Sequence, residues 1–264
     1  MIVKKKGNIT FRNFDSITEL VEYTRKGEVK ECFKEAQSSV NGGYYFTKTN
    51  SYEEAEEMLL HGWEEMATKI NTKLKSMNVS KQTKQRTVYD VCGYQCSVPR
   101  YLQGVPTNMI NKQTVKQKQK VINICKSIVY SAKIDADVIL NESVKILHCI
   151  NTLEKQGYRV NLNIIIYCLK RNTHNVCTIK IKDASQKLNV KQIAFPLVHP
   201  SMLRRIFFRV EEIAEEYGSS FVLGYGIPGD VLNNEAIKEE LKGSYYFPSF
   251  VNEKEITDIE KYRI

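Results

Sequence analysis

The side chains best placed for chemistry in this sequence are His199, Arg204 and Arg205, which follow one another closely. The apolar spacing after Ser201 predicts a helix, so these residues stand at the helix entry. Backbone N–H groups at a helix N-terminus attract anions, and two neighbouring guanidinium groups would strengthen that attraction. The pattern therefore predicts an anion-binding corner, and an enzyme of unknown class would have its site there.

A structural role accounts for the same corner without a ligand, and the sequence favours it. His199 and Pro200 would then fix the entry loop, while the two arginines would pair with Glu211, Glu212 or other nearby carboxylates. No Ser/His/Asp arrangement can be placed, since none of the four histidines lies beside an obvious nucleophile turn. We therefore assign no catalytic residue from the sequence.

Two further patterns resemble cofactor or metal motifs. The run Gly224–Gly229 satisfies Gly-x-Gly-x-x-Gly after a predicted strand, which is typical of dinucleotide binding. Pro228 removes a backbone N–H from that loop, and too little chain follows for an acidic ribose ligand. Cys92 and Cys96 have no second cysteine pair nearby. We expect no cofactor and no metal.

Positive charge is concentrated in residues 69–120, where eleven lysines and arginines are set against a single acid, Asp90. The whole chain carries a formal net charge of +9, so the remainder is close to neutral. Such a stretch can follow a phosphate backbone, and Tyr89, Tyr94 and Tyr101 could stack on bases. The predicted nucleic-acid- or anion-binding residues within it are Lys81, Lys84, Arg86, Arg100, Lys112, Lys116, Lys118 and Lys120.

Two other interpretations of this basic segment stay open. A lysine-rich connection that is simply solvated would have the same composition, and the sequence favours that interpretation. An acidic protein surface would attract the same charge as well as a nucleic acid does.

The composition is that of a soluble globular protein, with 42% hydrophobic and 26% charged residues among 264. No stretch approaches the roughly 18 apolar residues of a membrane span, so we expect no membrane partner. The N-terminus turns polar after two apolar residues, which does not fit a signal peptide. Seven irregularly spaced cysteines, several within apolar runs, are typical of reduced thiols in a cytoplasm.

The clearest fold signal is a strand at 121–130, a helix at 135–157 and a second strand at 159–169. A unit of this length predicts two parallel strands with the crossover helix on one face of the sheet. Strands and helices continue to alternate downstream, which predicts a three-layer α/β sandwich over 121–264.

The rest of the chain divides by composition. We expect a small helical N-terminal region over 1–75, then a basic, partly extended connection over 76–120 that contributes an edge strand or a hairpin. Local patterns add several expectations: a short strand at 44–46, one helix from Ser51 to about Leu74, a strand at 176–181 paired with the one before it, an extended piece at 195–200, a helix capped by Ser201, a strand at 219–225 and a helix at 230–242.

The βαβ unit, with Ser127 and Ser131 after its first strand, resembles the opening of a von Willebrand factor A domain. That resemblance implies a metal site of the pattern Asp-x-Ser-x-Ser at the strand end. This chain has Lys126 there instead of an aspartate, and its serines are four apart rather than two. The metal motif is therefore not intact, and we carry over no ligand.

Across nearly its whole length the chain is similar to an uncharacterised family of tailed-bacteriophage and prophage proteins. The resemblance implies a phage-encoded protein in the cytoplasm of an infected or lysogenic bacterium, or in the virion. Its landmarks are Phe46–Ala55, His61-Gly-Trp63, Gly104–Met109, Leu153–Val160 and Phe195–Arg205.

From the resemblance and the basic segment together we expect a non-enzymatic protein that acts by macromolecular interaction. The expected role is a virion or assembly-associated component whose partner is a phage structural protein or a host protein. The alternatives are a nucleic-acid-binding accessory protein that uses residues 69–120, and an enzyme with a site near His199, Arg204 and Arg205.

Overall fold

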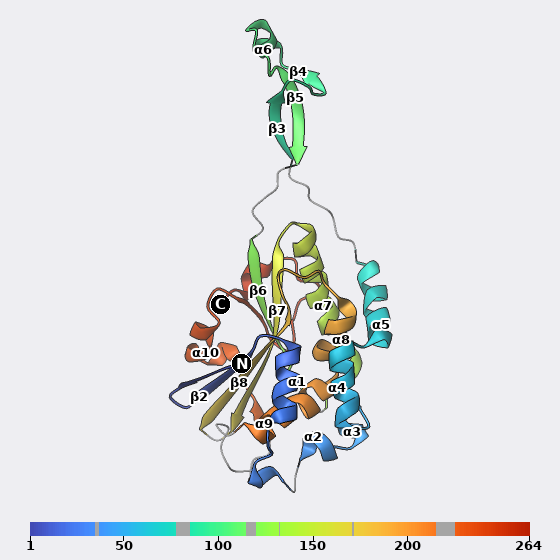
Figure 1. Cartoon of the computed structure of the whole chain (residues 1–264), viewed down its shortest axis with the longest axis vertical. Helices are drawn as coiled ribbons and strands as arrows, with labels where there is room; N and C mark the ends of the chain where they lie inside the picture. Colours follow the sequence, from blue (N-terminus) through green and yellow to red (C-terminus); the bar gives the residue numbers. More distant parts are fainter. Residues whose placement is uncertain (35–36, 78–84, 115–119, 132, 171, 215–224) are drawn as a thin grey trace.

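The computed structural model describes residues 1–34, 37–77, 85–114, 120–131, 133–170, 172–214 and 225–264. It consists of a body built on a central sheet and a small module, residues 85–114, that projects from the end of the body where the sheet strand β6 begins (Figure 1). Lys81, Lys84, Lys116, Lys118 and the strand predicted at 219–225, apart from Tyr225, lie outside the described residues.

The central sheet has seven strands and mixes parallel with antiparallel pairs. Its order is β1 (Ile2–Lys6), β2 (Ile9–Phe14), β8 (Thr173–Lys182), β7 (Arg159–Lys170), β6 (Val121–Ser127) and β10 (Tyr245–Phe247), with β9 (Ile227–Pro228) also beside β7. The pairs β2–β8, β7–β6 and β6–β10 are parallel, while β1–β2 and β7–β8 are antiparallel. The expected hairpin between the strand at 159–169 and the next strand is thus confirmed.

The predicted βαβ unit is confirmed as β6, α7 (Ala136–Lys155) and β7. The side chain of Asp135 begins the helix by accepting a hydrogen bond from the Asp137 N–H at 2.8 Å. Ile146, Leu147 and Ile150 recur at helical spacing and are fully buried against the sheet.

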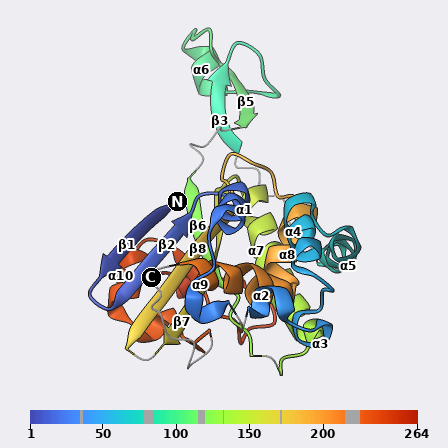
Figure 2. The same ribbon diagram turned by 60° about the horizontal axis from the view of Figure 1, so that its bottom comes forward.

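Helices cover the two faces of the sheet unequally (Figures 1 and 2). The larger apolar cluster lies beneath α1 (Ile17–Lys26), α4 (Tyr52–His61), α5 (Glu64–Lys75), α7, α8 (Val190–Val198), the π-helix η2 (Met202–Phe207) and α9 (Phe208–Ile213). The smaller cluster lies on the opposite face, under α10 (Glu235–Glu240) and the 3-10 turn η5 (Val231–Asn233). The body is therefore an α/β sandwich with one thick and one thin helical layer. Short helical turns complete it: η1 (Glu31–Phe33), α2 (Ser38–Asn41), α3 (Tyr44–Thr47) and η6 (Ile259–Tyr262).

The N-terminal region differs from the separate helical region expected over 1–75. Strand β2 pairs in parallel with β8 inside the central sheet, and its Phe14 belongs to the larger core cluster. The first strands were missed because this parallel pairing joins segments more than 160 residues apart in sequence, which local patterns do not reveal.

Three local expectations are also corrected. Residues 44–46, expected as a strand, lie in α3. The single helix expected from Ser51 breaks into α4 and α5 at Gly62, whose φ of 84° stops the first helix. The extended piece expected at 195–200 is mostly the end of α8, and Pro196 sits inside that helix.

No helix in the described part of the chain is long and apolar enough to cross a membrane.

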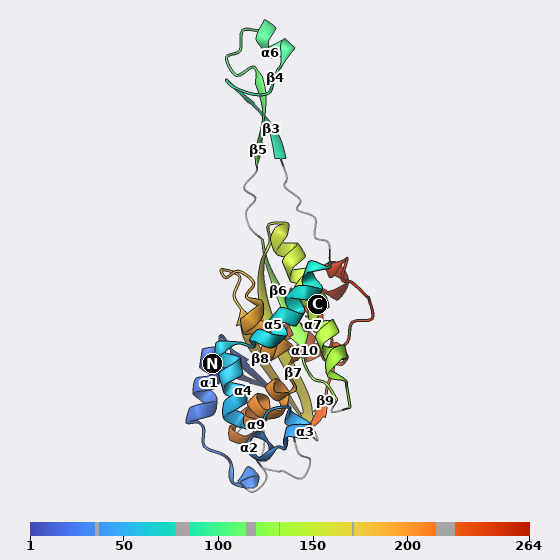
Figure 3. The same ribbon diagram turned by 90° about the vertical axis from the view of Figure 1, so that its right-hand side faces the viewer.

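The module is a three-stranded antiparallel sheet with one short helix (Figure 3). Its elements are β3 (Gln85–Asp90), β4 (Gln95–Cys96), α6 (Val98–Leu102) and β5 (Met109–Thr114), with β5 in the middle. Pairing of β3 with β5 agrees with the hairpin expected for this part of the chain. A sheet this small has little room for an apolar core, so its side chains stay largely accessible.

Candidate nucleic-acid interface

Three tyrosines of the module are exposed although they are large and mostly apolar. Tyr89 is 48% exposed, Tyr94 60% and Tyr101 64%. Aliphatic side chains accompany them at the surface, namely Val91, Val98 and Leu102. Exposed aromatic and aliphatic side chains on so small a unit are typical of a contact surface rather than of a folded core.

Two cations of the basic segment lie against these rings. The guanidinium carbon of Arg100 is 4.0 Å from the centroid of Tyr89, and the Lys112 ammonium is 5.5 Å from that of Tyr94. Arg100 also donates to the carbonyl oxygen of Thr107 at 3.1 Å, which fixes its plane over the ring. A planar cation stacked on an aromatic ring offers its outer face to a further flat group.

The turn between β3 and β4 holds Tyr94 rigidly beside β5. The Tyr94 N–H donates to the carbonyl oxygen of Ile110 at 3.0 Å. Gly93 allows this approach, because a Cβ at that position would lie 2.2 Å from the same oxygen. Tyr89, on β3, and Tyr94, in this turn, are therefore both held by the three-stranded sheet.

The structure brings together part of the predicted basic set. Arg100 and Lys112 lie on the module beside the tyrosines, Arg86 belongs to β3, and Lys120 is exposed where the chain re-enters the body. The one acid of the segment, Asp90, caps its own turn by accepting from the Val91 N–H at 2.7 Å. Positive charge therefore dominates the surface around the rings.

His199, at the other predicted site, is buried, and it packs against two aromatic rings. Its ring centroid is 4.8 Å from that of Trp63 and 5.0 Å from that of Phe195. The Ser201 N–H donates to its Nδ1 at 3.1 Å. Burial lowers the pKa of His199 to about 4, so the ring is neutral at neutral pH.

Arg205 is fully buried, and all five of its N–H donors have protein partners. Nε donates to the hydroxyl of Thr49 at 2.6 Å, and Nη2 to the carbonyl oxygens of Thr49 and Gly42 at 2.8 and 3.0 Å. Nη1 donates to the carbonyl oxygens of Ser39 and Val40 at 2.8 and 3.1 Å. An anion could bind this guanidinium only by displacing protein acceptors.

Arg204 makes a similar contact with α3, and we call the contacts of the two arginines the arginine clamp. One Nη donates to the carbonyl oxygen of Phe46 at 2.5 Å, and its guanidinium carbon is 4.7 Å from the Phe46 ring centroid. The expectation that the arginine pair binds Glu211 and Glu212 is therefore wrong. Glu212 instead accepts from Ser39 and Tyr225, and the arginines hold residues 39–49 through neutral groups.

Ser201 does not cap the following helix as predicted. Its backbone is already helical, and its hydroxyl bonds to Thr47 and Thr49, which belong to the segment that Arg205 holds. The helix begins as a π-helix and contributes both arginines to the clamp. A π-turn widens the helix locally, which suits the delivery of neighbouring side chains to one target.

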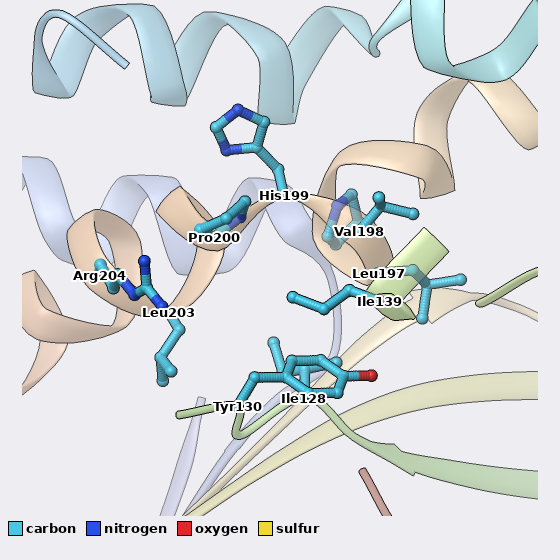
Figure 4. Close-up of a pocket in the computed structure, with 10 residues that line it drawn as sticks. Ile128, Tyr130, Ile139, Leu197, Val198, His199, Pro200, Leu203 and Arg204 are labelled. Carbon is cyan, nitrogen blue, oxygen red and sulfur yellow. The ribbon is translucent and has the colours of Figure 1, made fainter. Parts of the chain in front are cut away.

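A small cavity of about 10 Å³ separates this corner from the end of β6 (Figure 4). Ile128, Tyr130, Ile139 and Leu203 line it together with His199. This volume holds about one water molecule. Among the described residues, this cavity at the corner is too small for a substrate, and the hydrogen bonds of the two arginines fit a structural clamp.

Sequence reasoning missed a buried polar cluster between α9 and the sheet. Asn175 of β8 donates to Oε1 of Glu211 at 3.5 Å, and burial raises the pKa of Glu211 to about 7 although Lys170, Lys30 and Arg12 oppose the shift. Lys170 Nζ, Asn175 Oδ1 and Glu211 Oε2 have no hydrogen-bond partner among the described residues. The members come from β2, the residues before η1, β7, β8 and α9, so no local sequence pattern could predict the cluster.

Within the described ranges, no three His, Cys, Asp or Glu side chains lie close enough together to hold a metal ion.

Comparison with known proteins gives a family for the chain but no relative of known activity. No curated protein and no solved structure matches it. The family described as a domain of unknown function, DUF7192, matches residues 2–262, which includes both the body and the module. The chain therefore belongs to the DUF7192 family.

Proposed function

We propose that this protein binds single-stranded nucleic acid through its projecting module and acts without catalysing a reaction. The observation that carries the proposal is the set of exposed tyrosines on a basic module, with Arg100 and Lys112 lying against two of the rings. Stacking on aromatic side chains and neutralisation of phosphates are the two interactions that single-strand binding requires.

The exposed rings favour unpaired bases over a duplex. A tyrosine can stack on a base only where the base face is free, whereas paired bases are already stacked on their neighbours. The lysines that flank the module in sequence, Lys81, Lys84, Lys116, Lys118 and Lys120, would follow the phosphates on either side.

Fluorescence anisotropy with a labelled 20-nucleotide single strand tests this function across a range of salt concentrations. We expect binding whose logarithm falls linearly with the logarithm of salt concentration, because phosphate contacts release counterions. Replacing Lys112, Lys116, Lys118 and Lys120 by Glu should lower the magnitude of that slope by about 3. Undetectable or salt-independent binding would reject the proposal.

The matched control reverses four exposed lysines of the body, Lys26, Lys34, Lys48 and Lys133. Lys26 ends α1 and Lys48 follows α3, and both helices lie in the half of the body away from the module (Figure 1). This variant has the same net charge as the first, so an equal loss of binding would show that overall charge rather than the module attracts the strand.

A second candidate function is docking to a phage structural protein or a host protein as a virion or assembly component. The exposed aliphatic side chains of Val91, Val98 and Leu102 favour it, because apolar contacts at the centre of an interface suit a protein partner. Mass spectrometry of purified particles tests this role, and absence of the protein from the particles would reject it.

A von Willebrand A-like arrangement of the body is likewise a proposal. It is supported by the β6–α7–β7 unit and by β10, which lies parallel on the other side of β6. Lys126 at the end of β6 donates to the carbonyl oxygens of Pro248 and Ser249 at 2.5 and 2.7 Å. A side-chain cation would thus replace the metal that the von Willebrand A resemblance implies at this strand end. X-ray crystallography of the protein would test the arrangement.

A further inference from the structure

One half of the thinly covered sheet face is open and lined by polar side chains. The other half, around Phe11, Val176 and Tyr167, is apolar and packs against α10 and η5. Because α10 has only six residues, it does not reach the part of the face nearer the module. The open part is lined by the polar side chains of Asn13, Asn123, Asn163, Thr178 and Lys180, by the carboxylates of Asp15 and Glu240, and by Phe11 and Val176 where it meets the apolar half.

Strand register places these side chains in adjacent rows across four strands. Asn13 of β2 is opposite Thr178 of β8, and Lys180 of β8 is opposite Asn163 of β7. One step further, Asn161 of β7 is opposite Asn123 of β6. The rows alternate with the buried positions of the same strands, so all of them face the same side of the sheet.

Asparagine is an unusual choice for these positions. It is depleted in strands, and a merely solvated sheet face is better served by Thr, Lys or Glu. Asn123, Asn161 and Asn163 lie on the central strands β6 and β7. A group of side chains that opposes local propensity is expected where a site requires their chemistry.

A groove of about 240 Å³ runs over these rows, with the end of α10 and Ser244 as one wall. The amide of Asn161 donates to Oδ1 of Asn123 at 2.8 Å, while its own Oδ1 accepts from the Ala184 N–H at 2.6 Å. Asn161 is thus committed to the protein and orients Asn123. In the described part of the chain, the side chains of Asn13 and Thr178 make no hydrogen bond and are open to the groove.

Asn123, which lines the groove, lies near the start of β6, and Lys120 is exposed just before that strand. Among the described residues, Lys180 makes two long ion-pair contacts of 3.9 Å, to Asp15 and to Asp183, so its ammonium can turn towards a phosphate. A strand bound to the module can therefore continue past Lys120 into the groove.

We propose that this groove binds unpaired bases of the same single strand through the carboxamides of Asn13, Asn123 and Asn163. A carboxamide presents one donor and one acceptor side by side, which matches the edge of a base and suits adenine best. Lys180 contacts the phosphate of the bound nucleotide. The inference rests on the proposed function, to which it adds base contacts at a second surface.

The test compares two labelled probes of the same length, oligo(dA) and an abasic strand that has phosphates and sugars only. Replacing both Asn13 and Asn163 by Ala should weaken binding of oligo(dA) at least about fivefold, since each base contact is lost with its carboxamide. Binding of the abasic strand and the salt slope should not change. Asn252→Ala, at an exposed asparagine outside the groove, is the matched control.

The single variant Asn163→Asp keeps the size of the side chain and replaces the amide donor, which also contacts the carbonyl oxygen of Ile124 at 3.5 Å, by a carboxylate. Asn163→Asp should also weaken binding of oligo(dA). Thermal unfolding checks that the variant is folded. Unchanged oligo(dA) affinity in both variants overturns the groove while leaving the module's function standing. Failure of the unmodified protein to bind either strand overturns both.

Discussion

Arg205 donates two hydrogen bonds to Thr49, from Nε to the hydroxyl at 2.6 Å and from Nη2 to the carbonyl oxygen at 2.8 Å. Thr49 lies in the bend between α3 and α4, so this pair ties residues 39–49 to the π-helix η2. The guanidinium is fully buried and its hydrogen-bond partners are all neutral. Arg205 therefore stabilises the fold through the number of its hydrogen bonds rather than through an ion pair.

Arg205→Met should lower the free energy of unfolding by about 3 kcal/mol or more, because several buried carbonyl oxygens lose their donors. The stability of Arg205→Lys should lie between those of the unmodified protein and Arg205→Met. A lysine ammonium keeps the charge, but it has fewer donors in another geometry. Urea unfolding measures both. Arg25→Met, at an exposed arginine paired with Glu56, is the control and should lower the free energy of unfolding far less. An equal loss in Arg25→Met and Arg205→Met would contradict the clamp.

His199 should make the protein sensitive to acid. Its folded-state pKa of about 4 lies below the ordinary 6.5, so the folded state disfavours the charged ring. The stability that neutral His199 provides is present above pH 6.5 and is lost as the pH falls towards 4. We expect unmodified protein to lose about 3 kcal/mol more than His199→Gln between pH 7 and pH 4. Parallel pH dependences in urea unfolding would show that His199 titrates normally.

Glu211 should act in the opposite direction. Its folded-state pKa of about 7 lies above the ordinary 4.5 because burial disfavours the carboxylate, against the charges of Lys170, Lys30 and Arg12. The stabilising proton is fully effective below pH 4.5 and is lost as the pH rises through about 7. Glu211→Gln should therefore hold its stability between pH 5 and pH 8 while unmodified protein declines by about 3 kcal/mol. Thermal unfolding across this pH range measures both proteins. If Glu211→Gln loses as much stability as the unmodified protein, a group other than Glu211 is titrating.

Gly62 should tolerate no side chain. Its φ is 84°, and a Cβ would lie 2.7 Å from the carbonyl oxygen of Lys191, to which the Trp63 N–H bonds at 3.0 Å. Gly62→Ala combines backbone strain with this collision and should cost more than about 2 kcal/mol. Gly157→Ala, at a φ of 93° with nothing within 4 Å, shows the strain alone and should cost about 1 kcal/mol. Similar losses in urea unfolding would mean that the neighbouring chain simply moves aside.

The sequence predicted those parts of the fold whose contacts are local or strongly periodic. The β6–α7–β7 unit follows from long apolar runs, and the β7–β8 hairpin follows from a short turn between two strand patterns. The pairing of β2 with β8 could not be predicted from the sequence, because it joins a short strand to a partner far away in the chain. Gly62 marked a break in a helix pattern that otherwise continued through it.

The sequence predicted a basic, tyrosine-containing surface but not how its side chains are arranged. Lysines and tyrosines in residues 69–120 indicated a polyanion surface, and the fold then placed Arg100 and Lys112 on the rings. The partners of Arg204 and Arg205 could not be read from the chain, because backbone carbonyl oxygens carry no residue signature. The asparagine rows were equally hidden, since only strand register brings Asn13, Thr178 and Asn163 side by side.

The two ends of the module meet as hydrogen-bonded neighbours, with Gln85 opposite Thr114. A unit that departs and returns at one place adds surface to the protein without dividing the sheet beneath it. Such a unit can change in length or sequence while the body keeps its fold. Among members of the DUF7192 family we therefore expect sequence variation to concentrate in residues 85–114, and conservation in the strands of the central sheet.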